Sequence, residues 1–259
     1  MITVAIANQK GGVGKTTTAI NIATAMAATG WRTLLLDLDP QGNASTGLGI
    51  ASDAREFSSY DLLIEGSSLA QIAQKTGIPG LDIVPATQDL SGAEVELVSA
   101  NDRAERLRQA LGAGSSRHDI CFIDCPPSLG LLTLNALTAA DTLLVPLQCE
   151  FFALEGLSQL LQTVERVQQR FNPDLGIVGV VLTMFDRRNR LTDQVADDVR
   201  DCLGPLVFES VIPRNVRLSE APSHGLPALV YDHHCAGSRA YIALARELIG
   251  RLPAQRKAA

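Results

Sequence analysis

Residues 10–17 have the sequence Lys-Gly-Gly-Val-Gly-Lys-Thr-Thr, and this stretch decides the fold. The apolar run Ile2–Ala7 precedes it, and a segment rich in alanine and isoleucine follows it. This order predicts a buried parallel strand, a glycine-rich loop and a helix that ends at about Thr29. The position of the first glycine in the P-loop pattern G-x-x-x-x-G-K-[ST] holds Gln9, and the rest of the pattern is present in Gly12, Gly14, Lys15 and Thr16.

The chemistry of this loop favours phosphate binding. Glycines let the backbone approach a phosphate and turn its N–H groups inward. The positive end of the following helix adds to the attraction. We expect Lys15 to reach the terminal phosphates and the Thr16 hydroxyl to ligate Mg²⁺. The alternative is a glycine turn before an ordinary helix, but it gives no reason for Gly-Lys-Thr at a junction of strand and helix.

Two more apolar runs end in aspartate. The predicted strand Thr33–Asp39 is followed by Pro40, and the predicted strand Asp119–Asp124 has the form of a Walker B strand. Ligands bind at the carboxyl ends of strands in open α/β sheets. We therefore expect Asp39 to act at the phosphate site and Asp124 to hold Mg²⁺ through a water. The alternative for both residues is a strand-ending aspartate that only starts a turn.

The remaining chain continues to alternate between strands and helices. Further strands are predicted at Leu81–Pro85, Thr142–Leu147, Gly176–Met184 and Phe208–Ile212. A loop from Ala44 leads into short helices, and helices are predicted at Tyr60–Glu65, Leu69–Lys75, Glu94–Leu111 and Gly237–Leu252, with two more that end at about Phe171 and Cys202. This alternation predicts an α/β fold with a doubly wound, mostly parallel sheet flanked by helices. We expect one domain over residues 1–259, without an N-terminal helix-turn-helix domain because the first strand begins at residue 2.

Composition narrows the function classes. The net charge of −6 over 259 residues excludes a uniformly basic surface for nucleic acid, but not a local basic patch. The five cysteines are scattered and odd in number, which favours a reducing cytoplasm over a secreted disulfide framework. We expect no signal peptide, and the longest apolar run, near Leu175–Phe185, is too short to span a bilayer.

A second lysine in the loop, Lys10, points to a family. The chain resembles the ParA/MinD group of P-loop ATPases, and within it the ParA (Soj-like) partition proteins. The deviant Walker A motif of that group carries an extra lysine near its start. The resemblance extends from end to end of the chain, since its motifs match residues 8–17, 37–43, 124–128 and 212–222. Gln9 is part of the family's own form of the loop.

The resemblance implies an ATP- and Mg²⁺-dependent mechanism. ATP would close two subunits face to face into a homodimer, in which Lys10 reaches the partner's phosphates and Gly11 lies at the seam. Lys15 would hold the phosphates, and Asp39 would position the attacking water and sense the γ-phosphate and its metal. The nucleotide would be bound by Lys10, Gly11, Gly12, Val13, Gly14, Lys15, Thr16 and Thr17 in the loop, by Pro213 and Asn215 at adenine, and by Glu150 at the partner's nucleoside.

The family also implies that the ATP dimer binds double-stranded DNA without sequence preference. Basic residues cluster after two late predicted strands, at Arg187, Arg188 and Arg190, and at Arg214 and Arg217. Arg188 and Arg217 match the family's DNA-contacting arginines most closely, and Arg187 and Arg190 are further candidates. The alternative is a set of solvated loop charges. A ParB-like centromere-binding protein would stimulate hydrolysis, and the protein would be cytoplasmic and associated with the nucleoid.

Three other functions compete with DNA partition. A ParA-like protein can position a non-DNA cargo, such as a chemoreceptor cluster. A MinD-like membrane ATPase needs a C-terminal amphipathic helix, whereas here the terminal helix is expected to stop near Pro253, and Arg256 and Lys257 follow no apolar face. We therefore expect no membrane partner. A metabolic P-loop kinase would leave Lys10 unexplained.

Overall fold

The computed structural model describes residues 1–113 and 117–252. The expectations for Pro253, Arg256 and Lys257 lie outside these residues. The described part of the chain forms a seven-stranded sheet in the order β3-β4-β2-β5-β1-β6-β7, in which β3 is antiparallel to β4 and the other pairs are parallel. The strands are β1 Ile2–Ile6, β2 Thr33–Asp37, β3 Gln74–Lys75, β4 Leu81–Val84, β5 Ile120–Asp124, β6 Thr142–Gln148 and β7 Gly176–Thr183.

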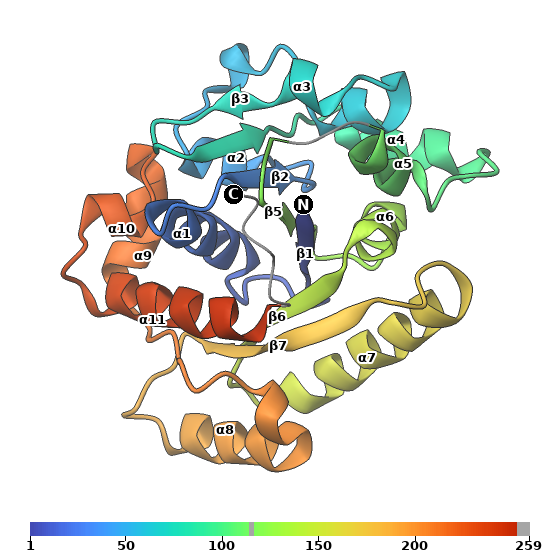
Figure 1. Cartoon of the computed structure of the whole chain (residues 1–259). Coiled ribbons are helices and arrows are strands. Elements are labelled where there is room, and N and C mark those ends of the chain that lie inside the picture. Colours follow the sequence, from blue (N-terminus) through green and yellow to red (C-terminus); the bar gives the residue numbers. More distant parts are fainter. Residues whose placement is uncertain (114–116, 253–259) are drawn as a thin grey trace.

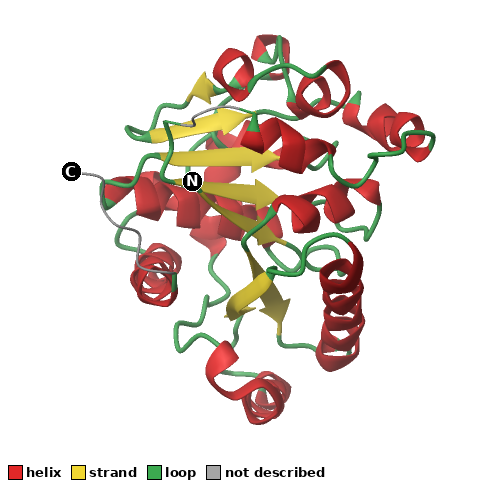
Figure 2. Cartoon of the chain, turned by 45° about the vertical axis from the view of Figure 1, so that its right-hand side comes forward, coloured by secondary structure: helices red, strands yellow, loops and turns green. Residues whose placement is uncertain are grey.

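Helices connect the strands and cover both faces of the sheet (Figures 1 and 2). They are α1 Lys15–Ala28, α2 Asn43–Gly47, α3 Leu69–Ile72, α4 Leu90–Val98, α5 Arg106–Gly112, α6 Leu131–Ala139, α7 Ala153–Arg170, α8 Arg190–Leu203, α9 Val216–Glu220, α10 Ala228–Tyr231 and α11 Ala236–Arg251. Single turns of other helix types lie at η1 Ser52–Ala54, η2 Asp61–Glu65, η3 Gly204–Leu206 and η4 Ala221–His224. The predicted doubly wound, mostly parallel sheet is confirmed. Within the described residues, no helix is both long and apolar enough to cross a membrane.

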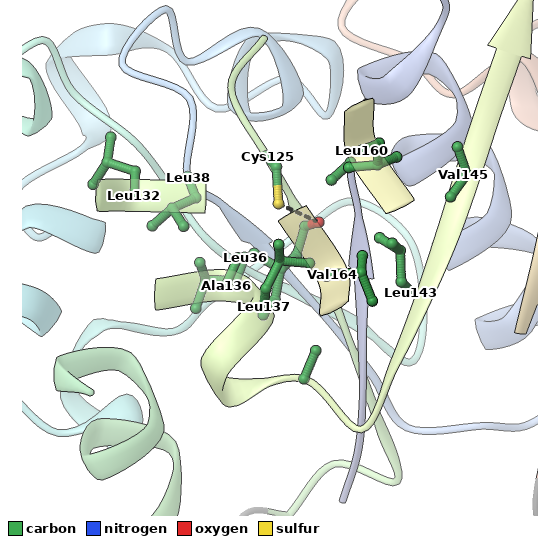
Figure 3. Close-up of a cluster of buried hydrophobic side chains, with 14 of the residues drawn as sticks. Leu36, Leu38, Cys125, Leu132, Ala136, Leu137, Leu143, Val145, Leu160 and Val164 are labelled. Carbon is green, nitrogen blue, oxygen red and sulfur yellow. Dashed lines mark hydrogen bonds between the residues drawn. The ribbon is translucent and has the colours of Figure 1, made fainter. Parts of the chain in front are cut away.

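The parallel strands are mostly apolar because both of their faces are buried, whereas the short edge strand β3, Gln74–Lys75, is polar and partly exposed. Side chains alternate between faces along a strand, so Leu34 and Leu36 pack with α6 and α7, while Leu35 packs with α1 and α11. Figure 3 shows Leu36 in the first of these two cores, with Leu160 and Val164 of α7 in the same cluster. Helices α1 and α6 lie on opposite faces, and β1, which α1 follows, lies between β5 and β6. The connections on the two sides of β1 therefore leave toward opposite faces of the sheet. This arrangement places the carboxyl end of β1 at the crevice where such sheets bind ligands.

The predicted strand Phe208–Ile212 is wrong. Two isolated backbone bonds join this segment to β7, from Phe208 N to Val180 O at 2.9 Å and from Ile212 N to Leu182 O at 2.8 Å. Between them, the N–H groups of Glu209 and Ser210 donate to the Glu247 carboxylate of α11 at 2.9 and 3.0 Å. A side chain thus takes the donors that a ladder would need, and the segment runs beside β7 without forming a strand.

Two helix predictions also differ from the structure, and further helices were not predicted. The predicted helix Glu94–Leu111 is split into α4 and α5, because Asn135 of α6 bonds to Arg103 O at 2.6 Å and to Leu107 N at 3.2 Å in the connection. The predicted helix Leu69–Lys75 ends at Ile72, and the next residues pair with β4. Helix α2 lies where a loop was predicted, and helices α6, α9 and α10 were not predicted.

Candidate active site

The glycine-rich loop connects β1 to α1 with the geometry that its sequence predicts. Gly12 and Gly14 have φ angles of 76° and 87°, which L side chains rarely adopt. Gly14 precedes α1, and no side chain of the described residues caps this helix. Its first N–H groups and its positive end are therefore available to an anion. The loop is fixed from the other side, because Thr183 Oγ1 at the end of β7 donates to Val13 O at 2.8 Å.

Lys15 is buried beneath the loop. Its exposed fraction is 6%, and its Nζ donates to Lys10 O at 3.1 Å. Burial lowers the pKa of the Lys15 ammonium, while the charges of Asp124 and Asp39 act in the opposite direction. The structure thus brings Lys15, at the start of α1, near Asp39, which follows β2, and Asp124, which ends β5. Thr16, on the first turn of α1, lies close enough to Asp124 to influence its ionisation.

Asp124 has an unusual environment. It is fully buried, and neither of its carboxylate oxygens has a hydrogen-bond partner among the described residues. Burial raises its pKa well above the ordinary value, and the adjacent Asp37 raises it further. A buried carboxylate without a partner is strongly disfavoured in a folded protein unless a ligand completes it.

These residues fit a magnesium site better than a closed metal cage. Within residues 1–113 and 117–252, no group of three or more His, Cys, Asp or Glu side chains could hold a metal by itself. Mg²⁺ keeps several waters and combines one or two protein ligands with substrate phosphates. The orphaned Asp124 oxygens, the Thr16 hydroxyl and the adjacent phosphate loop supply that incomplete set.

Asp39 stands in a turn that a second aspartate fixes. Asp39 is 8% exposed, and its Oδ1 accepts a hydrogen bond from Gln41 N at 3.0 Å. Asp37 Oδ2 accepts from Ser45 N at 2.8 Å and from Ser45 Oγ at 2.7 Å, which ties the end of β2 to α2. Burial raises the pKa of Asp37 to about 6 despite these bonds. The sequence analysis did not assign Asp37 a role, although it is the last residue of the same apolar strand.

A cavity of about 440 Å³ opens behind the phosphate loop. It is lined by Gly14 and Thr17 of the loop region, by Pro213 and Asn215, and by further residues that include Met184 and Tyr241. The two residues predicted at adenine therefore lie together beside the phosphate loop, in a space of the size that small-molecule sites have. Their contact with a base stays a prediction.

Two residues of this cavity were missed by the sequence analysis. Met184 has a φ angle of 51°, which is uncommon for a residue with a side chain. Tyr241 is fully buried, and its hydroxyl shares a hydrogen bond of 3.1 Å with Thr18 Oγ1 on α1. No motif marks either position. The sequence showed only that Met184 ends an apolar run and that Tyr241 stands in a predicted helix, and neither signal indicates a ligand.

Lys10 and Glu150 meet within one chain. The Lys10 ammonium forms an ion pair with the Glu150 carboxylate, and both side chains are partly exposed. Glu150 follows β6, so this pair links the phosphate loop to the β6–α7 connection. The sequence analysis expected both residues to act across a dimer seam, and that role stays a prediction.

The two basic segments are neighbours in space. Phe185 N donates to Ile212 O and Arg214 N donates to Phe185 O, each at 3.0 Å, so the segments 185–190 and 213–217 begin side by side. Arg188 is paired with Asp186 at 2.8 Å, and Arg217 with Glu220 at 2.8 Å. The side chains at 187 and 190 are exposed as well. The four arginines predicted to bind DNA are thus exposed and stand on two segments that are joined at Phe185.

Comparisons with known proteins find chains that are similar over most of this sequence. A family model described as an AAA domain matches residues 1–177. The chromosome partitioning protein ParA of Caulobacter vibrioides (strain NA1000 / CB15N) is 60% identical over 249 residues, which are 95% of this chain and 93% of that protein. The sporulation initiation inhibitor protein Soj of Bacillus subtilis (strain 168) is 52% identical over 245 residues, or 95% of this chain and 97% of that protein.

A solved structure supports the comparison in three dimensions. Cobyrinic acid a,c-diamide synthase from Mycobacterium smegmatis, with bound ATP analog and magnesium, is 38% identical and superposes with a TM-score of 0.83. The match covers 96% of this chain and 94% of that one. The chain is therefore similar in sequence to partition proteins. It is similar in fold to a protein that was solved with a bound ATP analog and magnesium.

Proposed function

The chain belongs to the ParA/Soj family of chromosome-partitioning ATPases, and on this basis we propose that it is an ATP-operated switch that holds and releases DNA. The observation that carries the proposal is the cluster of Lys15, Asp39 and Asp124 at the phosphate loop, beside an edge that carries exposed arginines. The nucleotide would bind at the phosphate loop, and whether ATP or ADP is bound would decide whether the arginine edge holds DNA.

ATP and Mg²⁺ are the proposed cofactors. The loop N–H groups and Lys15 would bind the β- and γ-phosphates, and the base would enter the cavity that Pro213 and Asn215 line. Mg²⁺ would be held by Thr16 and, through a water, by Asp124. The metal would neutralise charge on the phosphates, while Asp39 would orient the attacking water. Hydrolysis would be slow until a partner acts.

The active form is proposed to be a homodimer closed across the phosphate loops. Gly11 supports this proposal. A Cβ atom built on Gly11 would meet Pro127 Cβ at 4.0 Å, an ordinary contact, and no closer atom among the described residues. The chain itself therefore tolerates a side chain at this position, whereas a partner approaching closely would not. Lys10 would have to leave Glu150 to reach the partner's phosphates.

DNA would bind along the arginine edge. Arg188 is 85% exposed, and both Arg188 and Arg217 are held by nearby carboxylates that a DNA phosphate could replace. Arg187 and Arg190 would contribute further phosphate contacts. Binding would be independent of sequence and would weaken with salt. A ParB-like protein would stimulate hydrolysis and release the dimer, which would associate with the nucleoid in the cytoplasm while its cargo moves.

Two variants test this function. We expect Asp39→Ala to trap a dimer that stays on DNA in the presence of ATP, as measured by light scattering and DNA co-elution. We expect Arg188→Glu with Arg217→Glu to dimerise but to lose about tenfold or more in DNA affinity, with a salt slope flatter by about one unit per lost phosphate contact.

The matched control is Arg166→Glu with Arg170→Glu, which makes the same charge change on exposed positions of α7. It should bind DNA more strongly than the arginine-edge variant at every salt concentration. Equal losses in the two double variants would show that net charge, and not this edge, governs DNA binding. A protein that stays monomeric with ATP in the Asp39→Ala background would refute the dimer.

A further inference from the structure

Arg55, which no motif marks, fastens the segment that follows Asp39. Its guanidinium donates to Ala86 O at 2.9 Å, just beyond the end of β4, and to Ile50 O at 2.8 Å, just beyond α2. It also donates to Thr46 Oγ1 at 2.8 Å. One side chain thus joins the residues that follow β4 to the C-terminal end of α2 and to the residues that follow it.

A hydrogen-bond chain connects Arg55 to Asp39. Thr46 Oγ1, which accepts from Arg55, donates to Gly42 O at 3.0 Å, and Gly42 N donates to Asp39 O at 2.8 Å. Gly42 has a φ angle of 61°, and a Cβ atom there would overlap Arg55 Nη1. The guanidinium therefore lies directly against the backbone that closes the Asp39 turn.

Packing alone does not hold this turn. A cavity of about 510 Å³ lies beside it, lined by Pro40 and Gln41 of the turn and by Thr46, Arg55 and Gln88. On this side the turn faces the cavity instead of packing against other described residues. A segment with an open side needs directional bonds to keep one position, and the Arg55 hydrogen bonds are of that kind.

We propose that Arg55 is a positioning residue for ATP hydrolysis, which fixes the Asp39–Gly42 turn against the end of β4 and so sets where the Asp39 carboxylate stands relative to the phosphate loop. The inference rests on the proposed role of Asp39. Arg55 touches neither nucleotide nor metal in this scheme. Its removal should slow the chemical step and leave ATP binding largely intact.

Arg251 offers a matched control elsewhere in the fold. Its guanidinium also binds backbone carbonyls, namely Val178 O at 3.2 Å, Leu206 O at 3.1 Å and Val207 O at 3.0 Å, and it packs on the Phe208 ring at 3.9 Å. Arg251 ends α11 and joins it to β7, away from the Asp39 turn. Arg55→Met and Arg251→Met remove similar sets of bonds from two different places.

Steady-state ATP hydrolysis of the full chain is the test. We expect Arg55→Met to lower kcat by about tenfold or more with KM for ATP within about threefold, and Arg251→Met to keep kcat within about twofold. Thr46→Val, which removes the relay hydroxyl and keeps the branched side chain, should lower kcat by a smaller factor. Thermal melting shows whether Arg55→Met folds. If it does not fold, Thr46→Val still tests whether the hydrogen-bond chain from Arg55 to the Asp39 turn affects kcat.

Two outcomes separate the inference from the proposed function. If Asp39→Ala abolishes turnover while Arg55→Met and Thr46→Val hydrolyse ATP as fast as the wild type, Arg55 has no positioning role and the proposed function stands. If Asp39→Ala hydrolyses ATP normally, the proposed role of Asp39 fails, and the inference fails with it. In the double variant, Arg55→Met should add no further loss to Asp39→Ala, and independent, multiplying losses would also overturn the inference.

Discussion

Strand β5 has an aspartate at each end, and the two carboxylates are in opposite environments. Asp119, which precedes the strand, accepts from Arg32 N at 2.8 Å and from Arg32 Nε at 3.1 Å, and these hydrogen bonds hold its pKa below the ordinary value. Asp124, which ends the strand, is fully buried without a hydrogen-bond partner among the described residues, and burial holds its pKa well above the ordinary value. The same residue type is thus satisfied at one end of the sheet and unsatisfied at the other.

The acids of the neighbouring strands differ between the two ends in a second way, because they are spread out at the amino end and crowded at the carboxyl end, where only Asp124 among the described buried acids has no hydrogen-bond partner. At the amino end, Asp82 bonds to His118 Nε2 at 2.8 Å, and Asp141 accepts from Thr3 N at 2.7 Å. At the carboxyl end, Asp37 and Asp39 crowd near Asp124, with Lys15 as the adjacent cation. Complete pairing serves the stability of the fold, whereas incomplete pairing reserves a place for a ligand. The contrast between the two ends can be tested by substitution.

Lys15→Ala should have the largest effect. The variant removes the ammonium group that lies near Asp39 and Asp124 and that would bind the phosphates of ATP. We therefore expect ATP turnover to fall by about 100-fold or more. Phosphate-release assays and binding of a fluorescent ATP analogue measure the loss. Substitution of a basic residue at the amino end, Arg32→Ala, is the control and should leave turnover unchanged. Retained turnover in Lys15→Ala would remove the phosphate-loop assignment.

Asp124→Asn should follow in size. It keeps the shape of the side chain but removes the charge that Mg²⁺ would stabilise, so we expect Mg²⁺ to bind about 10- to 100-fold more weakly in the presence of ATP. The unliganded variant should melt at least as high as the wild type, because a buried carboxylate without a partner is replaced by a neutral group. A Mg²⁺ titration of turnover and a melting curve measure the two effects. A lower melting temperature with normal Mg²⁺ dependence would make Asp124 a structural residue.

Asp119→Asn should have the smallest effect. Turnover should stay normal, and the melting temperature at pH 7 should fall by less than about 4 °C, because partly exposed ion pairs contribute little. Arg32 lowers the pKa of Asp119 in the folded state, so its contribution is present above the ordinary value of 3.8 and is lost as the pH falls below it. The difference in melting temperature from the wild type should therefore shrink on acidification. A difference that grows below pH 4 would reverse the assigned sign.

The sequence predicted the parts of the site that lie close together along the chain. The phosphate loop, Lys15 and Thr16 are contiguous, and Asp39 and Asp124 end strongly apolar runs, so local patterns were enough to place them. Asp37 was missed because its partner, Ser45, lies on α2, which was not predicted. Among the described residues no side chain caps α2, so the sequence carries no capping signal for this helix.

Tertiary contacts decided what the sequence did not predict. Residues 208–212 have the apolar composition of a strand, but Glu247 of α11 binds their N–H groups and no local signal reports this. Arg55 escaped notice for a related reason, since two of its three partners are backbone carbonyls, which leave no trace in the sequence. The paired arrangement of the two arginine segments likewise depends on backbone bonds across Phe185.

Met184 shows a compromise between fold stability and ligand contact. A left-handed backbone at a residue with a side chain costs on the order of 1 kcal/mol, and a glycine at this position would avoid that strain. The methionine side chain has a use that glycine lacks, because its flexible, polarisable thioether lines the cavity behind the phosphate loop. We expect Met184→Gly to relieve the backbone strain, to lose the packing of the side chain, and to bind the proposed nucleotide more weakly. The strain at this residue is therefore consistent with a side chain that is retained for its place in the cavity wall.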